Sequence, residues 1–209
     1  MAERRLYDIS RGIREDTAVW PGDTPFSRRW VMRMENGDSC NVSTVTHSVH
    51  CGTHADAPFH FDPKGAPIDR VDLSKYVGKC LVLTAKSRDS LKVSDLAGID
   101  VAAEERLLVR GPDKLPDNQW KDDFFHCSLD AARHVALRHL KLLGLDSPSV
   151  DFMTSKELAA HKALTLGGVA ILESLDLSRV RDGHYELIAL PLKMIGGDGS
   201  LVRAVLRDL

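Results

Sequence analysis

Short runs of apolar residues, many of them alternating with polar ones, follow one another along the chain with turn residues between them. Such runs are typical of β-strands, in which successive side chains point to opposite faces. Eight segments have this pattern: 6–10, 30–34, 41–49, 79–85, 106–110, 140–145, 169–173 and 185–190. Turn signals such as Pro21-Gly22, Gly111-Pro112 and Gly196-Gly197 lie between several of them. The pattern therefore predicts a protein rich in strands.

Fewer segments have the spacing of a helix that buries one face. Ser128 is a suitable N-cap for a helix that continues to about Arg138. Its inward face would carry Leu129, Ala132, Val135 and Ala136. Ser155 is a suitable cap for a second helix that continues to about Leu164, and residues 95–99 predict a short third one.

Many strands with few helices predict an α/β fold, in which a mixed β-sheet forms the core and one or two helices cover it. No internal repeat, low-complexity tract or Pro/Ser-rich linker divides the 209 residues. We therefore expect one domain over residues 1–209, a length ample for a buried core. The order of the strands does not follow from the pattern.

Charge and cysteine usage narrow the classes of partner. The formal net charge of -2 provides no basic surface for nucleic acid. No apolar run approaches the length that crosses a bilayer, and the segment from Met1 to Leu6 leads into no apolar stretch of a signal peptide. The four cysteines include no Cys-x-x-Cys pair, which favours reduced thiols. We expect a cytoplasmic protein with no nucleic-acid or membrane partner.

The candidate chemistry is concentrated between His50 and His60, where His54 and Asp56 lie in the same short segment. Imidazole nitrogen and carboxylate oxygen are ligands of divalent ions such as zinc or manganese. These four residues have even numbers, so in an extended strand their side chains would face the same side. A straight strand would nevertheless separate His50 from Asp56 by roughly 20 Å. A common metal site therefore requires a bend, for which Gly52 is the obvious position. The alternative is a histidine-rich surface loop that binds nothing.

Two further candidate ligands lie later in the chain. Glu173 ends the apolar run from Val169 to Leu172, and a buried carboxylate needs a partner, which a metal would provide. The alternative is a side chain that reaches solvent or pairs with an arginine. His161 lies three residues from Leu158 and three from Leu164, so it is expected to face inward. Such a histidine, taken alone, is more often a hydrogen-bonded core residue than a ligand.

The spacing His50-x-Gly52-Thr53-His54-x-Asp56-x-Pro58-x-His60 resembles the signature of the cyclase-like metal-dependent amidohydrolase family. Other blocks, in the expected order, resemble its bacterial kynurenine formamidase (arylformamidase) branch. They are Asp8-Ile9-Ser10, Trp20-Pro21-Gly22-Asp23-Thr24-Pro25-Phe26, Asp146-Ser147-Pro148-Ser149-Val150-Asp151, Ile171-Leu172-Glu173-Ser174-Leu175, Leu190-Pro191-Leu192-Lys193 and Asp198-Gly199-Ser200. Cys51, between the first histidine and Gly52, departs from the pattern.

The resemblance implies a swivelling β/β/α fold, a homodimer and a site with two zinc ions per subunit, for which manganese or cobalt could substitute. His50, His54 and Asp56 would hold the first ion, and His161 would bind the second. Asp56 and Glu173 would contact both ions. The resemblance also places an acid/base residue at His60 and a substrate contact at Trp20, which the residues alone would equally allow to be a core or interface tryptophan.

The implied reaction is hydrolysis of N-formyl-L-kynurenine to L-kynurenine and formate, a step of tryptophan degradation. Two rival interpretations stay open. A related enzyme would use the same metals to hydrolyse a cyclic amide or lactone, as isatin hydrolases do. A metal-binding protein without catalysis would keep the ligands but not need His60. Gly-x-Ser-x-Gly is absent from the sequence, which disfavours a serine hydrolase.

Overall fold

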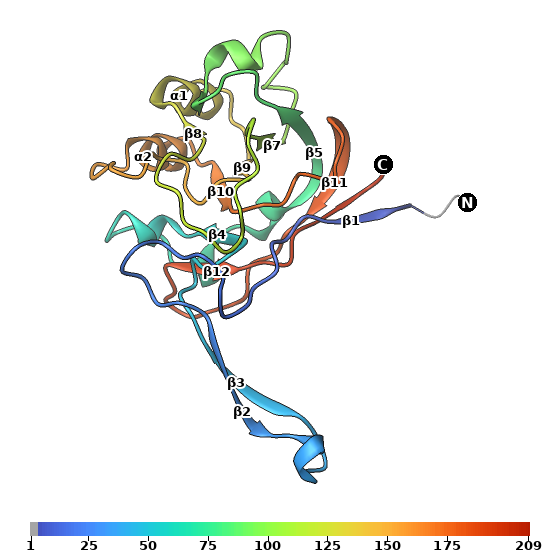
Figure 1. Ribbon diagram of the computed structural model, residues 1–209. Coiled ribbons are helices and arrows are strands. Elements are labelled where there is room, and N and C mark those ends of the chain that lie inside the picture. The colour runs from blue at the N-terminus through green and yellow to red at the C-terminus, as the bar shows by residue number, and fades with distance from the viewer. Residues whose placement is uncertain (1–3) are drawn as a thin grey trace.

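The computed structural model describes residues 4–209, and a nine-stranded mixed sheet forms its centre (Figure 1). Its strands are β1 (Leu6–Asp8), β4 (His54–Asp56), β5 (Val77–Thr84), β7 (Arg106–Arg110), β9 (Leu142–Leu145), β10 (Ala170–Glu173), β11 (Gly183–Ile188), β12 (Gly199–Leu201) and β13 (Val205–Arg207). Two small sheets pair β2 (Ser27–Met32) with β3 (Val42–Thr46), and β6 (Ser90–Leu91) with β8 (His126–Cys127).

Helices are few and short, which confirms the mixed α/β class. The two α-helices are α1 (Leu129–Ala136) and α2 (Ala159–Leu166). The 3-10 helices are η1 (Met34–Asn36), η2 (Pro58–His60), η3 (Ile68–Arg70), η4 (Leu73–Tyr76) and η5 (Val93–Leu96). Within residues 4–209, no helix has the length and apolar character that a bilayer crossing requires. The expectation about a signal peptide concerns in part residues 1–3, which lie outside the described residues.

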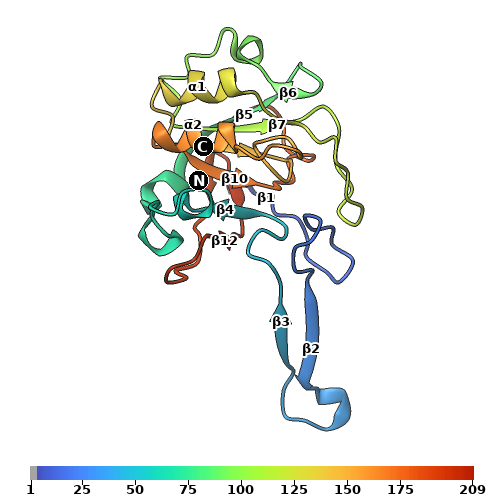
Figure 2. The ribbon, with the colours of Figure 1, turned by 90° about the vertical axis from the view of Figure 1, so that its left-hand side faces the viewer.

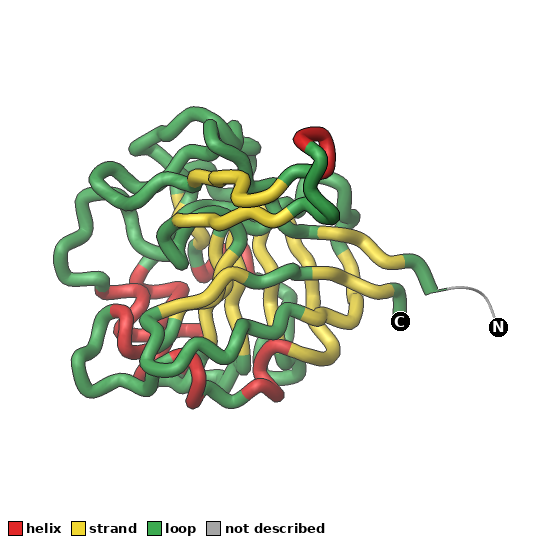
Figure 3. Tube along the Cα trace, turned by 90° about the horizontal axis from the view of Figure 1, so that it is seen from below, coloured by secondary structure: helices red, strands yellow, loops and turns green. Residues whose placement is uncertain are grey.

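The strand order in the large sheet is β1-β13-β11-β5-β7-β9-β10-β4-β12. Its centre is parallel, because β5, β7, β9 and β10 pair in the same direction, while the strands on either side pair antiparallel. β4 thus lies between β10 and β12, which come far later in the sequence. The view from below shows the strands side by side, with the first described residues beside the last (Figure 3).

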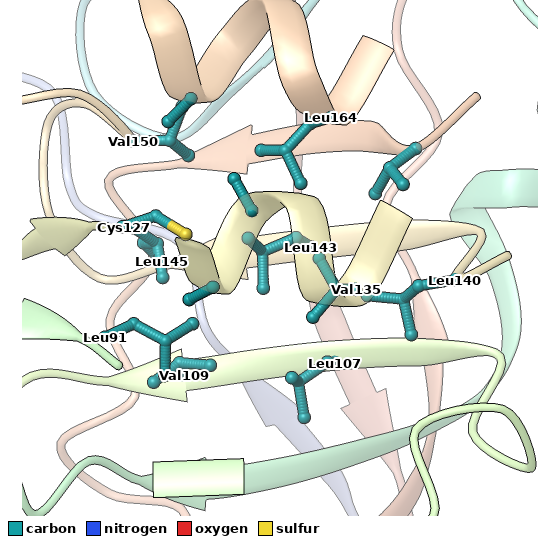
Figure 4. Packing of buried hydrophobic residues seen from close by; sticks show 14 of the residues in the cluster. Leu91, Leu107, Val109, Cys127, Val135, Leu140, Leu143, Leu145, Val150 and Leu164 are labelled. Atoms are coloured by element: carbon teal, nitrogen blue, oxygen red, sulfur yellow. The ribbon is translucent and has the colours of Figure 1, made fainter. Parts of the chain in front are cut away.

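Both α-helices cover one face of this sheet, and apolar side chains fill the space between them (Figure 4). Leu143 and Leu145 of β9 point to the helices, whereas Leu142 belongs to a second cluster on the opposite face. In the same way Ile171 of β10 faces the helices and Leu172 faces away. This alternation is the expected consequence of the strand repeat, and burial on both faces explains the continuous apolar runs.

All eight predicted strand segments overlap a strand, and 106–110 matches β7 throughout. The short strands β4, β6, β8, β12 and β13 were not predicted. Strands of two or three residues show no recognisable period, and their pairing depends on segments distant in sequence. β4 has no apolar pattern because two of its three residues, His54 and Asp56, are candidate metal ligands.

The helix predictions are confirmed in part. Ser128 caps α1 as expected, with its side-chain oxygen accepting from the Ala131 amide at 3.2 Å. The second helix was predicted to begin near Ser155, which is wrong, because α2 begins only at Ala159. The Ser155 hydroxyl instead accepts from the Leu158 amide in the preceding turn. The third predicted helix at 95–99 is a 3-10 turn, η5, placed slightly earlier.

Residues 27–46 form an arm that extends away from the body of the protein (Figures 1 and 2). The arm consists of β2, η1 and β3, and all side chains of β3 are exposed. Trp30, Val31 and Val45 are between 38% and 53% exposed. An isolated two-stranded hairpin is marginally stable at best in water. A hairpin that exposes large apolar side chains is therefore typical of a segment that packs against another surface.

Candidate metal centre

The segment from His50 to His60 turns sharply before it enters the sheet. Gly52 has a φ of +77°, in the left-handed region that side chains disfavour, and it provides the expected bend. His54 and Asp56 follow in β4 with their side chains on the same face. Pro58 then begins the 3-10 helix that carries His60. The segment is therefore not one extended strand. It consists of a turn at Gly52, the strand β4 and a 3-10 turn that carries His60.

The sheet brings Glu173 to the same place, because β10 pairs antiparallel with β4. In this register Glu173 lies opposite His54, and Ile171 lies opposite Asp56. Ile171 packs under α2 in the core, so Glu173, two residues later, also points toward that helix. His161 projects from α2 and is 3% exposed, which confirms that it faces inward.

These side chains form two groups that share Asp56. One contains His50, His54 and Asp56, and the other contains Asp56, His161 and Glu173, each with ligand atoms within 4.8 Å of one another. Oδ1 of Asp56 is 3.1 Å from Nδ1 of His50 and 3.4 Å from Nε2 of His54. Its other oxygen, Oδ2, is 3.3 Å from Nε2 of His161. The carboxylate therefore presents one oxygen to each group.

Glu173 has the same divided arrangement. Its Oε2 is 3.3 Å from Nε2 of His54, and its Oε1 is 3.3 Å from Nε2 of His161. Oε1 also accepts from the Val150 amide at 2.7 Å, which fixes the carboxylate. Asp56 therefore faces three imidazoles and Glu173 faces two, as in a site where acids bridge a pair of ions.

The unsatisfied polar atoms of this cluster fit divalent metal. His54 Nε2 and both carboxylate oxygens of Asp56 are buried and have no hydrogen-bond partner. Leaving such atoms unpaired is costly, and an ion would satisfy them together. Ligand atoms around a tetrahedral zinc at 2.0–2.2 Å are about 3.3–3.6 Å apart. The separations of 3.3 and 3.4 Å between the His54 or His161 nitrogens and the carboxylates match this spacing.

Both buried imidazoles are held by hydrogen bonds on the nitrogen that faces away from the cluster. His54 Nδ1 donates to the Gly52 carbonyl at 2.8 Å. His161 Nδ1 donates to Oδ2 of Asp151 at 2.7 Å, and the same carboxylate accepts from the amides of Ala160 and His161 at the start of α2. Such contacts fix the tautomer and leave Nε2 free to bind a metal.

The charges of the cluster reinforce one another. Burial alone would raise the pKa of Asp56, but the adjacent rings of His161, His50 and His54 outweigh it and hold the pKa well below its usual range. Burial alone would lower the pKa of His54, yet the adjacent carboxylates of Asp56 and Glu173 raise it to about 10. The pKa of His161 is likewise raised despite burial, first through Asp151. The acids are therefore ionised and ready to bind a cation.

His60 lies beside this cluster and differs from the other histidines. Its ring centroid is 4.1 Å from that of His50, its Nδ1 is 3.8 Å from Oδ2 of Asp198, and its side chain is 33% exposed. Partial burial lowers its pKa, so the imidazole is neutral at pH 7. His50 Nε2 is also 3.1 Å from Asp198. A neutral, solvent-accessible imidazole at the edge of the cluster is suited to proton transfer.

A cavity of about 490 Å³ opens above the cluster. Its floor includes His54, His161 and Glu173, and its wall includes Trp20 and Trp120. The two indole rings meet edge to face with centroids 5.2 Å apart, and each is also in contact with Phe124. The size and the aromatic wall suit a small aromatic ligand.

The structure thus brings together all the residues that the sequence singled out, namely His50, His54, Asp56, His60, His161, Glu173 and Trp20. Sequence reasoning did not assign roles to Asp151, Asp198 or Trp120. Asp198 lies in a glycine-rich turn, where an acid is ordinary, and nothing about Trp120 distinguishes it in the sequence. Asp151 could have been suspected as an acid ahead of a predicted helix.

Two residues near the motif do not belong to the ligand groups. The thiol of Cys51 is 1% exposed, and burial, followed by the charge of Asp23, raises its pKa, so it is a neutral thiol. His47 stacks on Phe26 and is hydrogen-bonded to the neighbouring Ser48 carbonyl, outside the two groups.

Paired histidine and carboxylate groups at the floor of a cavity define a metal-dependent hydrolase. The family model described as "Putative cyclase" matches residues 7–152, and the chain belongs to this family. It is 43% identical over 209 residues to the kynurenine formamidase of Bacillus mycoides (strain KBAB4), with both chains fully covered. It is 41% identical over 209 residues to the kynurenine formamidase of Erythrobacter litoralis (strain HTCC2594), covering all of this chain and 96% of the relative.

Among solved structures, the chain is similar to one described as a potential metal-dependent hydrolase with cyclase activity. The TM-score is 0.88 at 28% sequence identity, and the match covers 99% of each chain. The elements that carry the ligands therefore belong to a fold shared over the full length of both proteins.

Proposed function

We propose that the protein hydrolyses N-formyl-L-kynurenine to L-kynurenine and formate, as a metal-dependent amide hydrolase of tryptophan degradation. The observation that carries this proposal is the pair of ligand groups sharing Asp56 beneath an aromatic-walled cavity. Relatives named kynurenine formamidase, 41–43% identical over the whole chain, support the choice of substrate.

The residues present would hold two zinc ions per subunit. His50, His54 and Asp56 would bind the first ion, His161 would bind the second, and Asp56 and Glu173 would contact both. When bound, such ions supply Lewis acidity that lowers the pKa of water and polarises a carbonyl. The same nitrogen and oxygen ligands accept manganese or cobalt, so the identity of the metal is part of the proposal.

His60 would move the proton that the reaction requires. Hydrolysis of an aryl formamide must place a proton on the departing aryl nitrogen, and His60 is the neutral, partly exposed imidazole next to the ligands. It can take a proton from water and donate it to that nitrogen, which makes it a general base and then a general acid. Asp198, 3.8 Å away, would stabilise the protonated ring.

Trp20 would contact the aromatic ring of the substrate. Its contacts with Trp120 and Phe124 limit its movement, so the wall is rigid before the ligand arrives. A formyl group at the floor and an aryl ring against the wall would place the amide bond near His60.

The protein would act as a homodimer, and the arm supports this part of the proposal. Its apolar residues Trp30, Val31 and Val45 are exposed along a hairpin that extends from the body. A second copy of the chain is a partner against which an arm of this kind gains stability. We also propose a cytoplasmic location, since the four cysteines are unpaired and disulfides are rare in that compartment.

The proposal is tested with purified protein loaded with zinc and given N-formyl-L-kynurenine or isatin. We expect the formamide to be strongly preferred, activity to be lost on chelation, and activity to return when zinc is restored. A preference for isatin would instead identify a cyclic-amide hydrolase. Turnover of neither compound by the metal-loaded protein would contradict an enzymatic role.

His60→Ala separates catalysis from metal binding. General acid–base catalysis contributes about 10²- to 10⁴-fold to rate, so kcat should fall by that range while zinc content is retained. Metal content is measured on the same sample as activity. An unchanged kcat would remove His60 from the mechanism.

A further inference from the structure

Asp23 is a carboxylate on the cavity wall that the proposed mechanism does not use. It lines the cavity together with Trp20 and Trp120 and is not a member of the metal-ligand groups. Among residues 4–209 it forms no ion pair, whereas Asp117, near the same cavity, is paired with Arg11. An acid that faces a ligand cavity without a cation is available to bind one from the ligand.

The backbone holds Asp23 in place. Its amide donates to the Trp20 carbonyl at 2.9 Å, which closes a turn with Gly22 at a φ of +91°. Its Oδ1 accepts from the Thr24 amide at 2.7 Å. One carboxylate oxygen is thus used to fix the side chain, and Oδ2 has no hydrogen bond of its own within the described chain.

The cavity wall outside the metal-ligand groups carries a negative charge and no lysine or arginine of the described residues. Apart from the histidines and acid of the metal-ligand groups, Asp23 is the one charged side chain that lines the cavity among residues 4–209. The rest of the wall includes Val19, Pro21, Trp120, Pro148 and Leu158. The outer part of the cavity therefore favours a ligand that is aromatic and carries a positive charge.

We propose that Asp23 determines substrate specificity by binding the ammonium group of an aryl formamide that carries an amino-acid side chain. This inference rests on the proposed function. With the formyl group at the metal-ligand floor and the ring against Trp20, the side chain extends along the wall toward Asp23. The carboxylate of the substrate would meet no lysine or arginine of the described residues and would face the open mouth of the cavity.

Three substrates, tested on the metal-loaded protein, separate the contribution of the ammonium group from that of the carboxylate. They are N-formyl-L-kynurenine, its methyl ester, which lacks the carboxylate charge, and its deamino analogue, 4-(2-formamidophenyl)-4-oxobutanoate. A charge-assisted hydrogen bond is worth about 10- to 100-fold in binding. We expect kcat/KM to fall by that factor for the deamino analogue and to change less than fivefold for the methyl ester. A greater loss from esterification than from deamination would overturn the inference.

Asp23→Asn tests the residue itself, because its Oδ1 still accepts from Thr24 while the charge is removed. We expect the ratio of kcat/KM for N-formyl-L-kynurenine to that for the deamino analogue to fall about 10- to 100-fold toward unity. Asp113→Asn, which removes an exposed charge outside the cavity, is the matched control and should keep the wild-type ratio.

A ratio in Asp23→Asn equal to that of the wild type would overturn the role of Asp23, including when both substrates are hydrolysed more slowly. If the proposed function is wrong, the metal-loaded wild type will hydrolyse no aryl formamide, which is a different result. The two failures are therefore distinguishable in one set of assays.

Discussion

The side chains around the metal centre have two roles: some are candidate metal ligands, and others hold those ligands in position. Asp56 tolerates the least change, because its Oδ1 faces His50 and His54, its Oδ2 faces His161, and neither oxygen has a hydrogen-bond donor. Asp151 touches no ligand atom that faces the cavity, yet it fixes both the ring of His161 and the first turn of its helix.

Asp151→Asn should weaken metal binding at the group that includes His161. The amide cannot stabilise the imidazole as a carboxylate does, and loss of such a supporting contact costs about 10- to 100-fold in metal affinity. Zinc affinity is measured by competition with a chromophoric chelator. Asp130→Asn, which changes an exposed acid in the first turn of α1 outside the metal-ligand groups, serves as the control. Equal affinities for the two variants would show that Asp151 does not support the site.

Metal binding at neutral pH should release protons. In the metal-free chain the pKa of His54 is raised to about 10, so the ring holds a proton at pH 7 that a metal must displace. Affinity should therefore fall as the pH falls. Calorimetry in two buffers of equal pH and different ionisation enthalpy measures the protons released per ion. Identical heats in the two buffers would contradict the raised pKa.

The same pKa shift links the fold to pH in the absence of metal. A histidine whose pKa is higher in the folded than in the unfolded chain stabilises the fold fully below its ordinary value of 6.5. This contribution is lost as the pH rises through about 10. The metal-free protein should therefore unfold more easily at alkaline pH, and bound metal should remove this dependence.

At the scale of elements, the site depends on a turn, the two strands β4 and β10, and helix α2, which meet near one edge of the sheet. Gly52 is the position at which the turn can fail. Its φ of +77° disfavours any side chain, and an added Cβ would lie 2.9 Å from Cγ1 of Ile13. The histidines on either side of Gly52 would then move relative to each other.

Gly52→Ala should lower the free energy of unfolding by about 1–3 kcal/mol, because a left-handed alanine costs roughly 1–2 kcal/mol and the contact with Ile13 adds to it. Urea unfolding measures the loss, and zinc stoichiometry should fall with it. In Gly12→Ala an added Cβ meets nothing within 4 Å, so that variant should stay within about 0.5 kcal/mol of the wild type. Equal losses in both variants would argue against strain at Gly52.

The sequence predicts the apolar strands and the ligand types well, because burial and donor chemistry are properties of the residues themselves. The run before Glu173 predicts a buried strand, and β10 is one. It does not predict β4 or β12, whose three-residue lengths show no period and whose partners lie far away in the chain. Nor does it predict the pairing of Asp151 with His161, which depends on where α2 begins.

For the whole molecule, the arm is the feature that most affects association. Val45 lies opposite Arg28 on the face of the hairpin that also carries Trp30, whereas Thr44 lies on the other face. A lysine at Val45 would add a second positive charge beside Arg28, and burying it without a partner in the proposed homodimer would be strongly destabilising.

Val45→Lys should therefore shift the protein from dimer to monomer in sedimentation experiments at micromolar concentration. Thr44→Lys adds the same charge to the opposite face and should leave the dimer intact. A wild-type monomer would contradict the homodimer. A Val45→Lys variant that dimerises as the wild type does would place the contact elsewhere.

The position of β4 between two much later strands has a consequence for biosynthesis. His54 and Asp56 leave the ribosome long before β10 and β12, which enclose their strand. A nascent chain therefore cannot complete the centre until β10 and β12 have emerged and paired with β4. Until then the early ligands lack Glu173, so an ion bound by them at that stage is held by an incomplete set of ligands.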